Sequence, residues 1–349
     1  MIMKTRPRNG QWAERPRQRG RRTSETQLFA TIDYARAMSR DSGAGGLRVG
    51  IVGLGNMGGR IARRIAVGGF DVCGFDLDSD RAGAVGVAAV ASTFELAREV
   101  DVVLLSLPDS TVVEPVVREV RPACRPGQIV VDLSTSAPAS TIVLHRELAE
   151  SGVAFVDAGI SGGAAAAEKG TLTVMAGGDA AALDAVRPIL DTFSSRVVHM
   201  GASGTGHTAK LLNNFLNGIS LAATAEVMVA GKRAGLDLHL LLEVLNNSSG
   251  VNFATLNRFP SIVDGDYLEG GLTGDLMLKD VLLYRDLVEA LGVRTLTAPG
   301  CIEAFELAGE LGYGEQISNH VVDAIGDVSG GVRLYDEAAS AADEREGGR

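Results

Sequence analysis

The stretch that decides the fold is Leu47-Arg48-Val49-Gly50-Ile51-Val52-Gly53-Leu54-Gly55-Asn56-Met57-Gly58. Its first half is short and apolar, which is typical of a buried strand. The glycines that follow have the spacing G-x-G-x-x-G, and a helical pattern through Ile61 and Ile65 begins directly after them. A strand, a glycine-rich turn and a helix in this order predict the phosphate-binding turn of a dinucleotide-binding unit.

The three glycines have different expected tasks. Gly53 permits the tight turn, Gly55 lets the backbone approach a pyrophosphate, and Gly58 lets the helix pack closely on the strand. The start of the helix then offers unpaired N–H groups to the phosphates. The predicted cofactor-binding residues of this turn are Gly53, Gly55, Asn56, Met57 and Gly58.

A carboxylate ends the next predicted strand, residues 71–76. Asp76 can accept hydrogen bonds from the ribose hydroxyls of a dinucleotide, and it would repel a 2′-phosphate. Arg81 is the nearest side chain that could hold such a phosphate, and it lies a turn further along the chain. The sequence therefore predicts NAD as the cofactor in preference to NADP.

The pattern outward from this unit alternates strands with helices. Residues 101–107 and 128–132 are apolar almost throughout, as in strands covered on both faces of a parallel sheet, and residues 154–157 and 171–176 are later strand candidates. After Gly206 the segments are mostly helical, beginning with one long helix over 207–234. The predicted fold class is α/β, a Rossmann-type doubly wound sheet followed by an all-α C-terminal domain.

The expected domains are a dinucleotide-binding domain over 47–205 and a helical substrate and oligomerisation domain over 206–335. Residues 1–46 hold ten Lys or Arg against four Asp or Glu and little to bury, which predicts a disordered basic tail. An upstream start codon, with Met38 as the natural start, a nucleic-acid-binding arm and an organelle address are alternatives for it. Residues 336–349 are also expected to be a tail.

Composition excludes several classes of function. The net charge is −10 although the tail is basic, and an acidic body argues against nucleic acid as a partner. No apolar run is long enough for a membrane span, and no secretory signal is recognisable, so we expect a cytoplasmic protein. Three distant cysteines and five histidines make a disulfide framework or a metal site improbable.

A polar stripe marks the long helix. Lys210, Asn213 and Asn214 have the i, i+3, i+4 spacing that places side chains on one helix face, and Asn217 extends the stripe. Oxidising an alcohol requires a base for the hydroxyl proton, and a lysine can serve if burial lowers its pKa. A solvated stripe facing water is the alternative, and spacing alone does not decide between them.

Two further segments are ambiguous by themselves. Ser161-Gly162-Gly163 follows an apolar strand, and glycine N–H groups there suit a carboxylate, although a simple turn fits equally well. Lys279-Asp280 lies in a late helix, where spacing alone favours an exposed charged pair.

Taken together, these segments resemble the β-hydroxyacid dehydrogenase family, which includes 3-hydroxyisobutyrate dehydrogenase and tartronate semialdehyde reductase. The likeness covers residues 47–330, and six motifs in the family's order are far more specific than any one of them. They are Gly53-Leu54-Gly55-Asn56-Met57-Gly58; Leu107-Pro108-Asp109; Asp132-Leu133-Ser134-Thr135 with Pro138; Ser161-Gly162-Gly163 with Gly170-Thr171-Leu172; Gly206 with Lys210, Asn213 and Asn214; and Lys279-Asp280.

The resemblance implies roles for the residues that match these motifs. Lys210 would be the catalytic acid and base, while Asn213 and Asn214 would hold the substrate and orient the lysine. The substrate carboxylate would bind at Ser161, Gly162 and Gly163. The nicotinamide end of the cofactor site would be lined by Leu107, Pro108 and Thr135, and Lys279 would reach the cofactor or substrate from the second domain.

The family also implies homodimers or homotetramers with active sites in the cleft between domains. This chain departs from the family's pattern in having Gly159 in place of the usual proline, Ala166 in place of glycine, and Leu272 in place of an aromatic residue. Gly159 and Ala166 flank the expected carboxylate-binding loop. These two departures therefore bear on which substrate binds and leave the predicted reaction unchanged.

The predicted function is hydride transfer between NAD and a small 3-hydroxy acid or its semialdehyde. One alternative is an imine reductase on the same scaffold, although those relatives usually replace the lysine and prefer NADPH. A phosphosugar dehydrogenase of the 6-phosphogluconate type would need a longer chain and a basic phosphate clamp. A catalytically silent binding protein that uses the basic tail would tend to lose Lys210, which this chain keeps.

Overall fold

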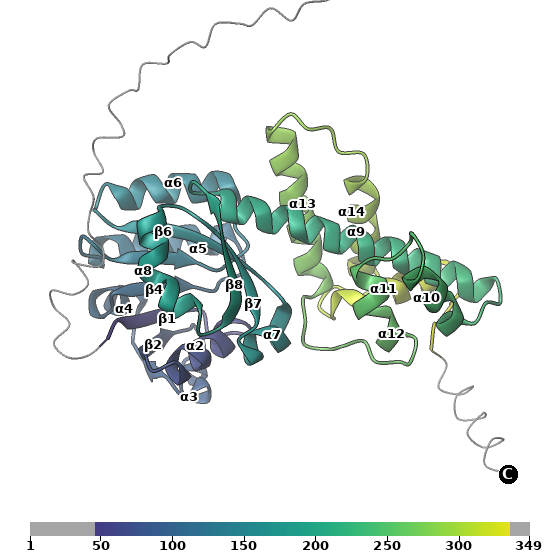
Figure 1. The fold of residues 1–349 in the computed structure, drawn as a ribbon, viewed down its shortest axis with the longest axis horizontal. Helices are drawn as coiled ribbons and strands as arrows, with labels where there is room; N and C mark the ends of the chain where they lie inside the picture. Colours follow the sequence, from purple (N-terminus) through teal and green to yellow (C-terminus); the bar gives the residue numbers. More distant parts are fainter. Residues whose placement is uncertain (1–45, 336–349) are drawn as a thin grey trace, which may run out of the picture. The chain divides into compact units, whose positions relative to one another are not determined.

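The computed structural model describes residues 46–335, and the predicted tails lie outside this range apart from Gly46. An eight-stranded sheet in the order β3-β2-β1-β4-β5-β6-β7-β8 forms the first part of the chain (Figure 1). Neighbouring strands are parallel except for the antiparallel pair β6 and β7. The strands are β1 Arg48–Val52, β2 Asp71–Phe75, β3 Ala88–Ala89, β4 Val102–Leu105, β5 Ile129–Asp132, β6 Ala154–Ser161, β7 Leu172–Gly177 and β8 Ser194–Gly201.

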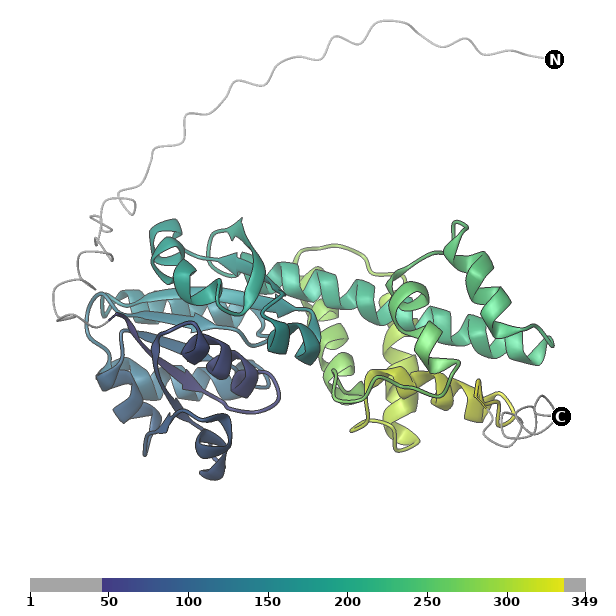
Figure 2. The same ribbon diagram turned by 60° about the horizontal axis from the view of Figure 1, so that its bottom comes forward.

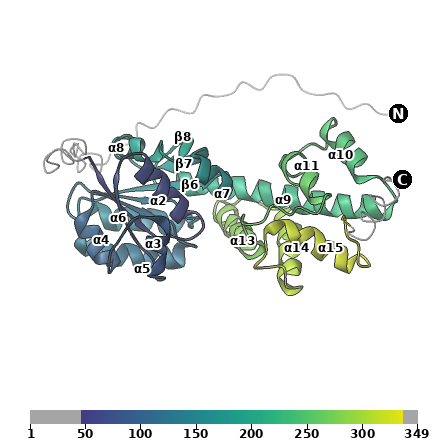
Figure 3. The ribbon, with the colours of Figure 1, turned by 90° about the horizontal axis from the view of Figure 1, so that it is seen from below.

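Helices cover both faces of this sheet, and Figure 3 shows α4 and α5 on the face opposite α8. The alternation of side chains along β1 explains why, because Ile51 joins the core beneath α2, α7 and α8 whereas Val52 joins the core beneath α4, α5 and α6. The doubly wound prediction is therefore confirmed. These helices are α2 Gly58–Val67, α3 Asp80–Val85, α4 Thr93–Glu99, α5 Ser110–Val120, α6 Pro138–Ala149, α7 Gly163–Lys169 and α8 Ala180–Leu190, with a 3-10 turn η2 at Arg121–Ala123.

The strand pattern differs from the sequence-based expectation at the β6–β8 edge. Strand β6 continues past Asp157 to Ser161, and β8 was not predicted. The reason is its place at the edge of the sheet, where half of its residues are exposed and no continuous apolar run marks it. The short strand β3 at the opposite edge was missed as well, since both of its alanines are exposed.

The rest of the described chain is helical, as predicted, and packs around α9, Thr205–Arg233 (Figure 2). Its only strand-like pairing among residues 205–335 is an isolated bridge between Thr273 and Ile317. The division into domains at residue 205 stays a prediction. The other helices are α10 Leu238–Asn246, α11 Phe253–Asn257, α12 Phe259–Ile262, α13 Gly274–Ala290, α14 Ala298–Glu310, η3 Ser318–His320 and α15 Val321–Val328.

The first turn of α9 lies directly against the backbone of β6 and β7. A Cβ on Gly206 would lie 2.5 Å from the carbonyl oxygen of Met175 and 2.6 Å from that of Asp157, so only glycine fits. One turn later the helix is equally close to β6, because a Cβ on Gly159 would lie 2.6 Å from the Cβ of Lys210. This close approach fixes where the polar stripe of α9 begins.

Replacing Gly206 with alanine is expected to lower the free energy of unfolding by about 2 kcal/mol or more, because rigid backbone atoms surround the added methyl group. The midpoint of urea unfolding measures the change. Gly300→Ala is the matched control, since nothing lies within 4 Å of its added Cβ in α14, and it should be neutral or slightly stabilising. Equal midpoints for the two variants would contradict the tight docking of α9.

Candidate active site

The glycine-rich turn has the geometry that its spacing predicts. Gly53 has a φ of +91°, and a Cβ there would lie 2.3 Å from the carbonyl oxygen of Ser106. A Cβ on Gly58 would lie 1.9 Å from the carbonyl oxygen of Gly53. Among residues 46–335, a Cβ on Gly55 would meet only Nη1 of Arg81, the end of a flexible side chain, at 3.1 Å. The first and third glycines therefore serve the turn itself, and the second leaves open space for a ligand.

A hollow of about 290 Å³ adjoins this turn. Helix α2 begins beside it without a side-chain cap, since the N-cap residue Met57 supplies no acceptor, and the positive end of the helix dipole there favours an anion. A pyrophosphate fits this combination of open space and an uncapped helix start. The residues lining the hollow are Leu54, Gly55, Asn56, Arg63, Arg81, Ala84 and Val85.

The carboxylate of Asp76 is fixed at the end of β2. One of its oxygens accepts from the backbone N–H of Leu54 at 2.7 Å and the other from that of Asp78 at 3.0 Å. Arg81, expected one turn further on, approaches the same carboxylate at 3.7 Å. The side chain is thus held beside the phosphate turn, where a ribose would lie in an NAD complex.

Lys210 is half-buried on the first turns of α9. Burial lowers the pKa of its ammonium group, the nearby carboxylate of Asp280 raises the pKa, and the charge of Lys279 lowers it again, with a net decrease. A lysine with a lowered pKa exists partly as the neutral amine near the working pH, which is the form that can take a proton from a hydroxyl group.

The asparagines beside Lys210 are joined in a chain that ends on α13. Nδ2 of Asn213 donates to Oδ1 of Asn214 at 3.2 Å, and Nδ2 of Asn214 donates to Oδ2 of Asp280 at 2.5 Å. Asn214 and Asp280 are both buried. Asn213 itself is exposed and Lys210 is half-buried, so the predicted stripe runs from the surface to the buried Asn214, whose amide is oriented by Asp280.

Asp280 was not among the predicted site residues. Its position next to Lys279 was the available signal, but spacing alone favoured an exposed charged pair. Instead, the side chains of Lys279 and Asp280 are only 23% and 2% exposed, with 3.0 Å between Nζ and Oδ1. The packing of α13 against α9 buries this pair. The residues around Lys279 and Asp280 in the sequence do not indicate that packing.

Lys279 connects the helical part of the chain to the loops that follow β4 and β5. Its ammonium group donates to the carbonyl oxygen of Pro108 at 2.8 Å and to that of Thr135 at 3.4 Å. Leu107 precedes this contact, and its N–H donates to the hydroxyl of Ser134 at 3.0 Å. The residues expected to line the nicotinamide end of the cofactor site thus lie together, around the ammonium group of Lys279 on α13.

The expected carboxylate loop begins at the end of β6. Ser161 is two residues beyond Gly159, so both face the same side of the strand, and Gly159 is packed against Lys210. Gly162 and Gly163 follow with φ values of +130° and +70°, which disfavour any other residue. The loop formed by Ser161, Gly162 and Gly163 therefore lies next to Lys210, the candidate acid and base.

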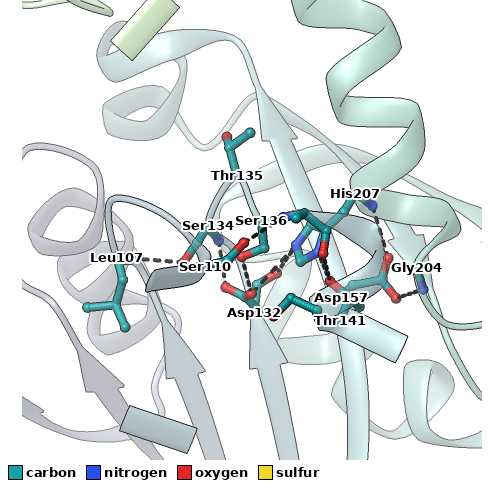
Figure 4. Close-up of polar contacts among 12 residues, drawn as sticks. Leu107, Ser110, Asp132, Ser134, Thr135, Ser136, Thr141, Asp157, Gly204 and His207 are labelled. Carbon is teal, nitrogen blue, oxygen red and sulfur yellow. Dashed lines mark hydrogen bonds and ion pairs between the residues drawn. The ribbon is translucent and has the colours of Figure 1, made fainter. Parts of the chain in front are cut away.

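A buried polar network beneath the site was missed by sequence reasoning. The carboxylate of Asp157 accepts from the N–H of Gly204 at 2.8 Å and from that of His207 at 2.9 Å. The ring of His207 contacts the hydroxyl of Thr141 at 2.7 Å and the carbonyl oxygen of Asp132 at 3.2 Å. Figure 4 shows Asp132, Asp157 and His207 gathered at the start of α9.

The same network extends into the loop after β5. One carboxylate oxygen of Asp132 accepts from the N–H of Ser134 at 2.9 Å, and the other accepts from the hydroxyl of Ser136 at 2.8 Å. The loop that carries Thr135 and the helix that carries Lys210 are therefore set by one cluster of hydrogen bonds. The sequence signal was a polar residue at the end of each strand, which alone is too common to interpret.

Over 46–335 no three His, Cys, Asp or Glu side chains are grouped so that they could hold a metal ion. No helix in the same range is long and apolar enough to cross a membrane.

Comparison with known proteins now identifies the family. Residues 48–201 match the NAD binding domain of 6-phosphogluconate dehydrogenase, and residues 204–325 match a domain described as NAD-binding of NADP-dependent 3-hydroxyisobutyrate dehydrogenase. The chain belongs to the β-hydroxyacid dehydrogenase family. As a member of it, the chain is an NAD-dependent oxidoreductase that transfers a hydride to or from small hydroxy acids.

Several relatives support this assignment over most of their length. The chain is 32% identical over 283 residues to 2-(hydroxymethyl)glutarate dehydrogenase of Eubacterium barkeri, covering 79% of this chain and 94% of that protein. It is 34% identical over 282 residues to the NAD-dependent L-serine dehydrogenase of Pseudomonas aeruginosa, covering 77% and 94%. Among solved structures, the 3-hydroxyisobutyrate dehydrogenase of Mycobacterium tuberculosis with L-serine has a TM-score of 0.74 at 29% identity, covering 79% and 98%.

Solved structures of imine reductases resemble this chain in fold alone. Imine reductases from Pseudomonas and Streptomyces aurantiacus share 19% and 20% identity with this chain, at a TM-score of 0.55. The scaffold is therefore common to both activities, whereas the more similar relatives are hydroxy acid dehydrogenases.

Proposed function

We propose that this enzyme oxidises the C3 hydroxyl group of a small 3-hydroxy acid, or reduces the corresponding semialdehyde, with Lys210 as the acid and base. The observation that carries the proposal is the setting of Lys210, a half-buried amine of lowered pKa beside a fixed amide and a buried carboxylate. That amine also lies close to Lys279, which holds the loops expected at the nicotinamide end.

The relatives' names agree with this substrate class. They are dehydrogenases of 2-(hydroxymethyl)glutarate, L-serine, L-threonate and 3-hydroxyisobutyrate. Each of these compounds carries a hydroxyl group on the carbon β to a carboxylate. A site that fixes the carboxylate at one point therefore presents the β-hydroxyl group at a constant distance from it, whatever the rest of the substrate.

The glycine-rich turn and Asp76 would hold the cofactor, which when bound supplies the acceptor or donor of the hydride. The chain's own residues would do the remaining work. Ser161 and the N–H groups of Gly162 and Gly163 would bind the substrate carboxylate. In oxidation the neutral amine of Lys210 would take the proton from the hydroxyl group, and in reduction its ammonium form would return a proton to the carbonyl oxygen.

Asn213 and Asn214 would act by orientation. The amide of Asn214 is locked by Asp280 on one side and by Asn213 on the other, so it cannot rotate freely. A fixed amide beside Lys210 would keep the substrate hydroxyl group within reach of the amine. Closure of the site between α9, α13 and the strand ends would restrict water and strengthen these contacts.

Replacing Lys210 with methionine keeps most of the side-chain volume and removes the amine. We expect kcat for NAD-dependent oxidation of 3-hydroxyisobutyrate to fall about 10²- to 10⁴-fold, the usual contribution of a general acid or base. Absorbance at 340 nm measures turnover, and titration calorimetry should show unchanged NAD binding. Lys169→Met, at an exposed position, is the control. A Lys210→Met variant within threefold of the parent would refute the assignment.

The pH dependence of oxidation should report the pKa of Lys210. Because the base must be neutral, kcat/KM should rise with pH through a value below the ordinary 10.5 for lysine. Asp280 raises this pKa, so Asp280→Asn should move the rising limb to lower pH. A pH profile of kcat/KM for the parent enzyme and for Asp280→Asn measures the shift. A limb that stays in place or moves to higher pH contradicts the proposed coupling.

We also propose that the enzyme is a homodimer or homotetramer. Support comes from apolar side chains that remain exposed on two helices of the second part of the chain, since monomers seldom expose several large apolar groups together. They are Leu212 and Leu216 on α9 and Leu240 and Val244 on α10. Sedimentation velocity is expected to show a dimer or tetramer that Leu216→Glu dissociates, whereas a parent protein that sediments as a monomer at micromolar concentration excludes the proposal.

A cytoplasmic location completes the proposal. The three cysteines, Cys73, Cys124 and Cys301, form no disulfide, in keeping with a reducing compartment.

A further inference from the structure

Arg258 is a half-buried cation without an acidic partner in the part of the chain that the structure describes. It stands between α11 and α12, partly enclosed, and its guanidinium group bonds only to neutral oxygens. Nη1 donates to Oδ1 of Asn319 at 2.6 Å and to the hydroxyl of Ser318 at 3.3 Å, and Nη2 donates to Oδ1 of Asn217 at 3.0 Å.

No carboxylate of residues 46–335 compensates the charge of Arg258, and the ring of Phe253 lies over its guanidinium carbon at 5.9 Å. Burial alone lowers the pKa of its guanidinium group to about 10, and no neighbouring carboxylate opposes the decrease. Arg333 differs, because Asp327 and Asp323 raise its pKa. Burying a charged group without a counter-charge is costly, and a bound anion would remove that cost.

The guanidinium group also has donors left over. An arginine has five N–H donors, and three are accounted for by Asn217, Ser318 and Asn319. The N–H on Nε and one N–H on Nη2 have no acceptor among residues 46–335. Two such donors on adjacent nitrogens match the two oxygens of one carboxylate.

Two routes connect Arg258 to the proposed substrate site. Asn217 follows Lys210 by seven residues, so it lies on the same face of α9 about 10 Å further along the axis. Ser318 lies beside Leu272, because its N–H donates to the carbonyl oxygen of that residue at 2.8 Å.

The second route continues to the cofactor turn. Two residues before Leu272, the carbonyl oxygen of Gly270 accepts from Nδ2 of Asn56, which belongs to the glycine-rich turn, at 2.9 Å. The cluster around Arg258 thus lies between the stripe that begins at Lys210 and a loop that touches the cofactor turn.

We propose that Arg258 binds a second carboxylate at the far end of the substrate, so that the preferred substrate is a 3-hydroxy acid with two carboxylates. This inference rests on the proposed function. The first carboxylate is held at Ser161–Gly163, the hydroxyl group faces Lys210, and the remaining chain extends along α9 past Asn214 towards Arg258. Asn217, Ser318 and Asn319 orient the guanidinium group for this second contact.

A purely structural role is the competing explanation, since the same three hydrogen bonds tie α9 to α12 and η3. Substrate pairs that differ only in the distal carboxylate separate the two roles. If Arg258 only holds the helices together, its loss would lower kcat/KM for both members of a pair. If Arg258 binds the distal carboxylate, its loss would lower kcat/KM only for the dianion.

The first experiment compares kcat/KM for 2-(hydroxymethyl)glutarate and 3-hydroxyisobutyrate in the parent enzyme, Arg258→Gln and Arg258→Lys. The parent should prefer the dianion. Arg258→Gln should lower kcat/KM for the dianion about 10- to 150-fold, as expected for lost hydrogen bonds between charged groups, and far less for the monoanion. Arg258→Lys should retain part of the preference because it keeps the charge. The exposed Arg294→Gln is the matched control and should change neither value.

The second experiment measures binding without turnover. Calorimetric titration of glutarate and butyrate, in the presence of NAD, should show tighter binding of glutarate to the parent enzyme and no such preference in Arg258→Gln. Thermal melting of each variant monitors the fold.

The outcomes separate this inference from the function on which it rests. If Arg258→Gln lowers kcat/KM equally for both substrates, or if parent and variant bind glutarate equally, the role of Arg258 is overturned. The proposed role of Lys210 is unaffected by either result. Arg258-dependent glutarate binding by an enzyme that oxidises no 3-hydroxy acid supports the anion site and refutes the proposed reaction.

Discussion

The buried carboxylate of Asp157 holds the first turn of α9 against the sheet, and the geometry of the candidate site depends on it. It accepts two backbone N–H groups at the positive end of a 29-residue helix, which compensates its charge in an interior position. Gly206 allows the helix backbone to approach β6 and β7 at this point. Lys210 follows one turn later, so the distance of its backbone from the strand ends is set by rigid backbone contacts.

The remaining charges of the site are held by contacts between α13 and two neighbours, the helix α9 and the loops that follow the strands. Asp280 on α13 orients Asn214 on α9, and Lys279 beside it bonds to carbonyl oxygens after β4 and β5. The pKa of Lys210 is then a balance between burial, which lowers it, and the Asp280 carboxylate, which raises it. A site built on two parts of the chain can accept different substrates while the proton-transfer group stays in place.

What could be predicted from the sequence is what local geometry dictates. Gly53, Gly55 and Gly58 follow from the backbone requirements of one turn, and the stripe from Lys210 to Asn217 follows from helical periodicity. Asp280, His207 and Arg258 could not be assigned, because their environments come from contacts between residues far apart in sequence. Asn214 and Asp280 are 66 positions apart, and Arg258 and Asn217 are 41 apart. Strand β8 escaped prediction for a related reason, since an edge strand is half exposed and has no apolar run.

A crystal structure of the ternary complex with NAD and a 3-hydroxy acid would show whether Lys210 faces the reacting hydroxyl group. We expect the C3 oxygen at about 2.6–3.2 Å from Nζ of Lys210, with the substrate carboxylate on Ser161, Gly162 and Gly163. A productive complex in which another side chain occupies that position, with Lys210 out of hydrogen-bond reach of the hydroxyl group, would contradict this expectation.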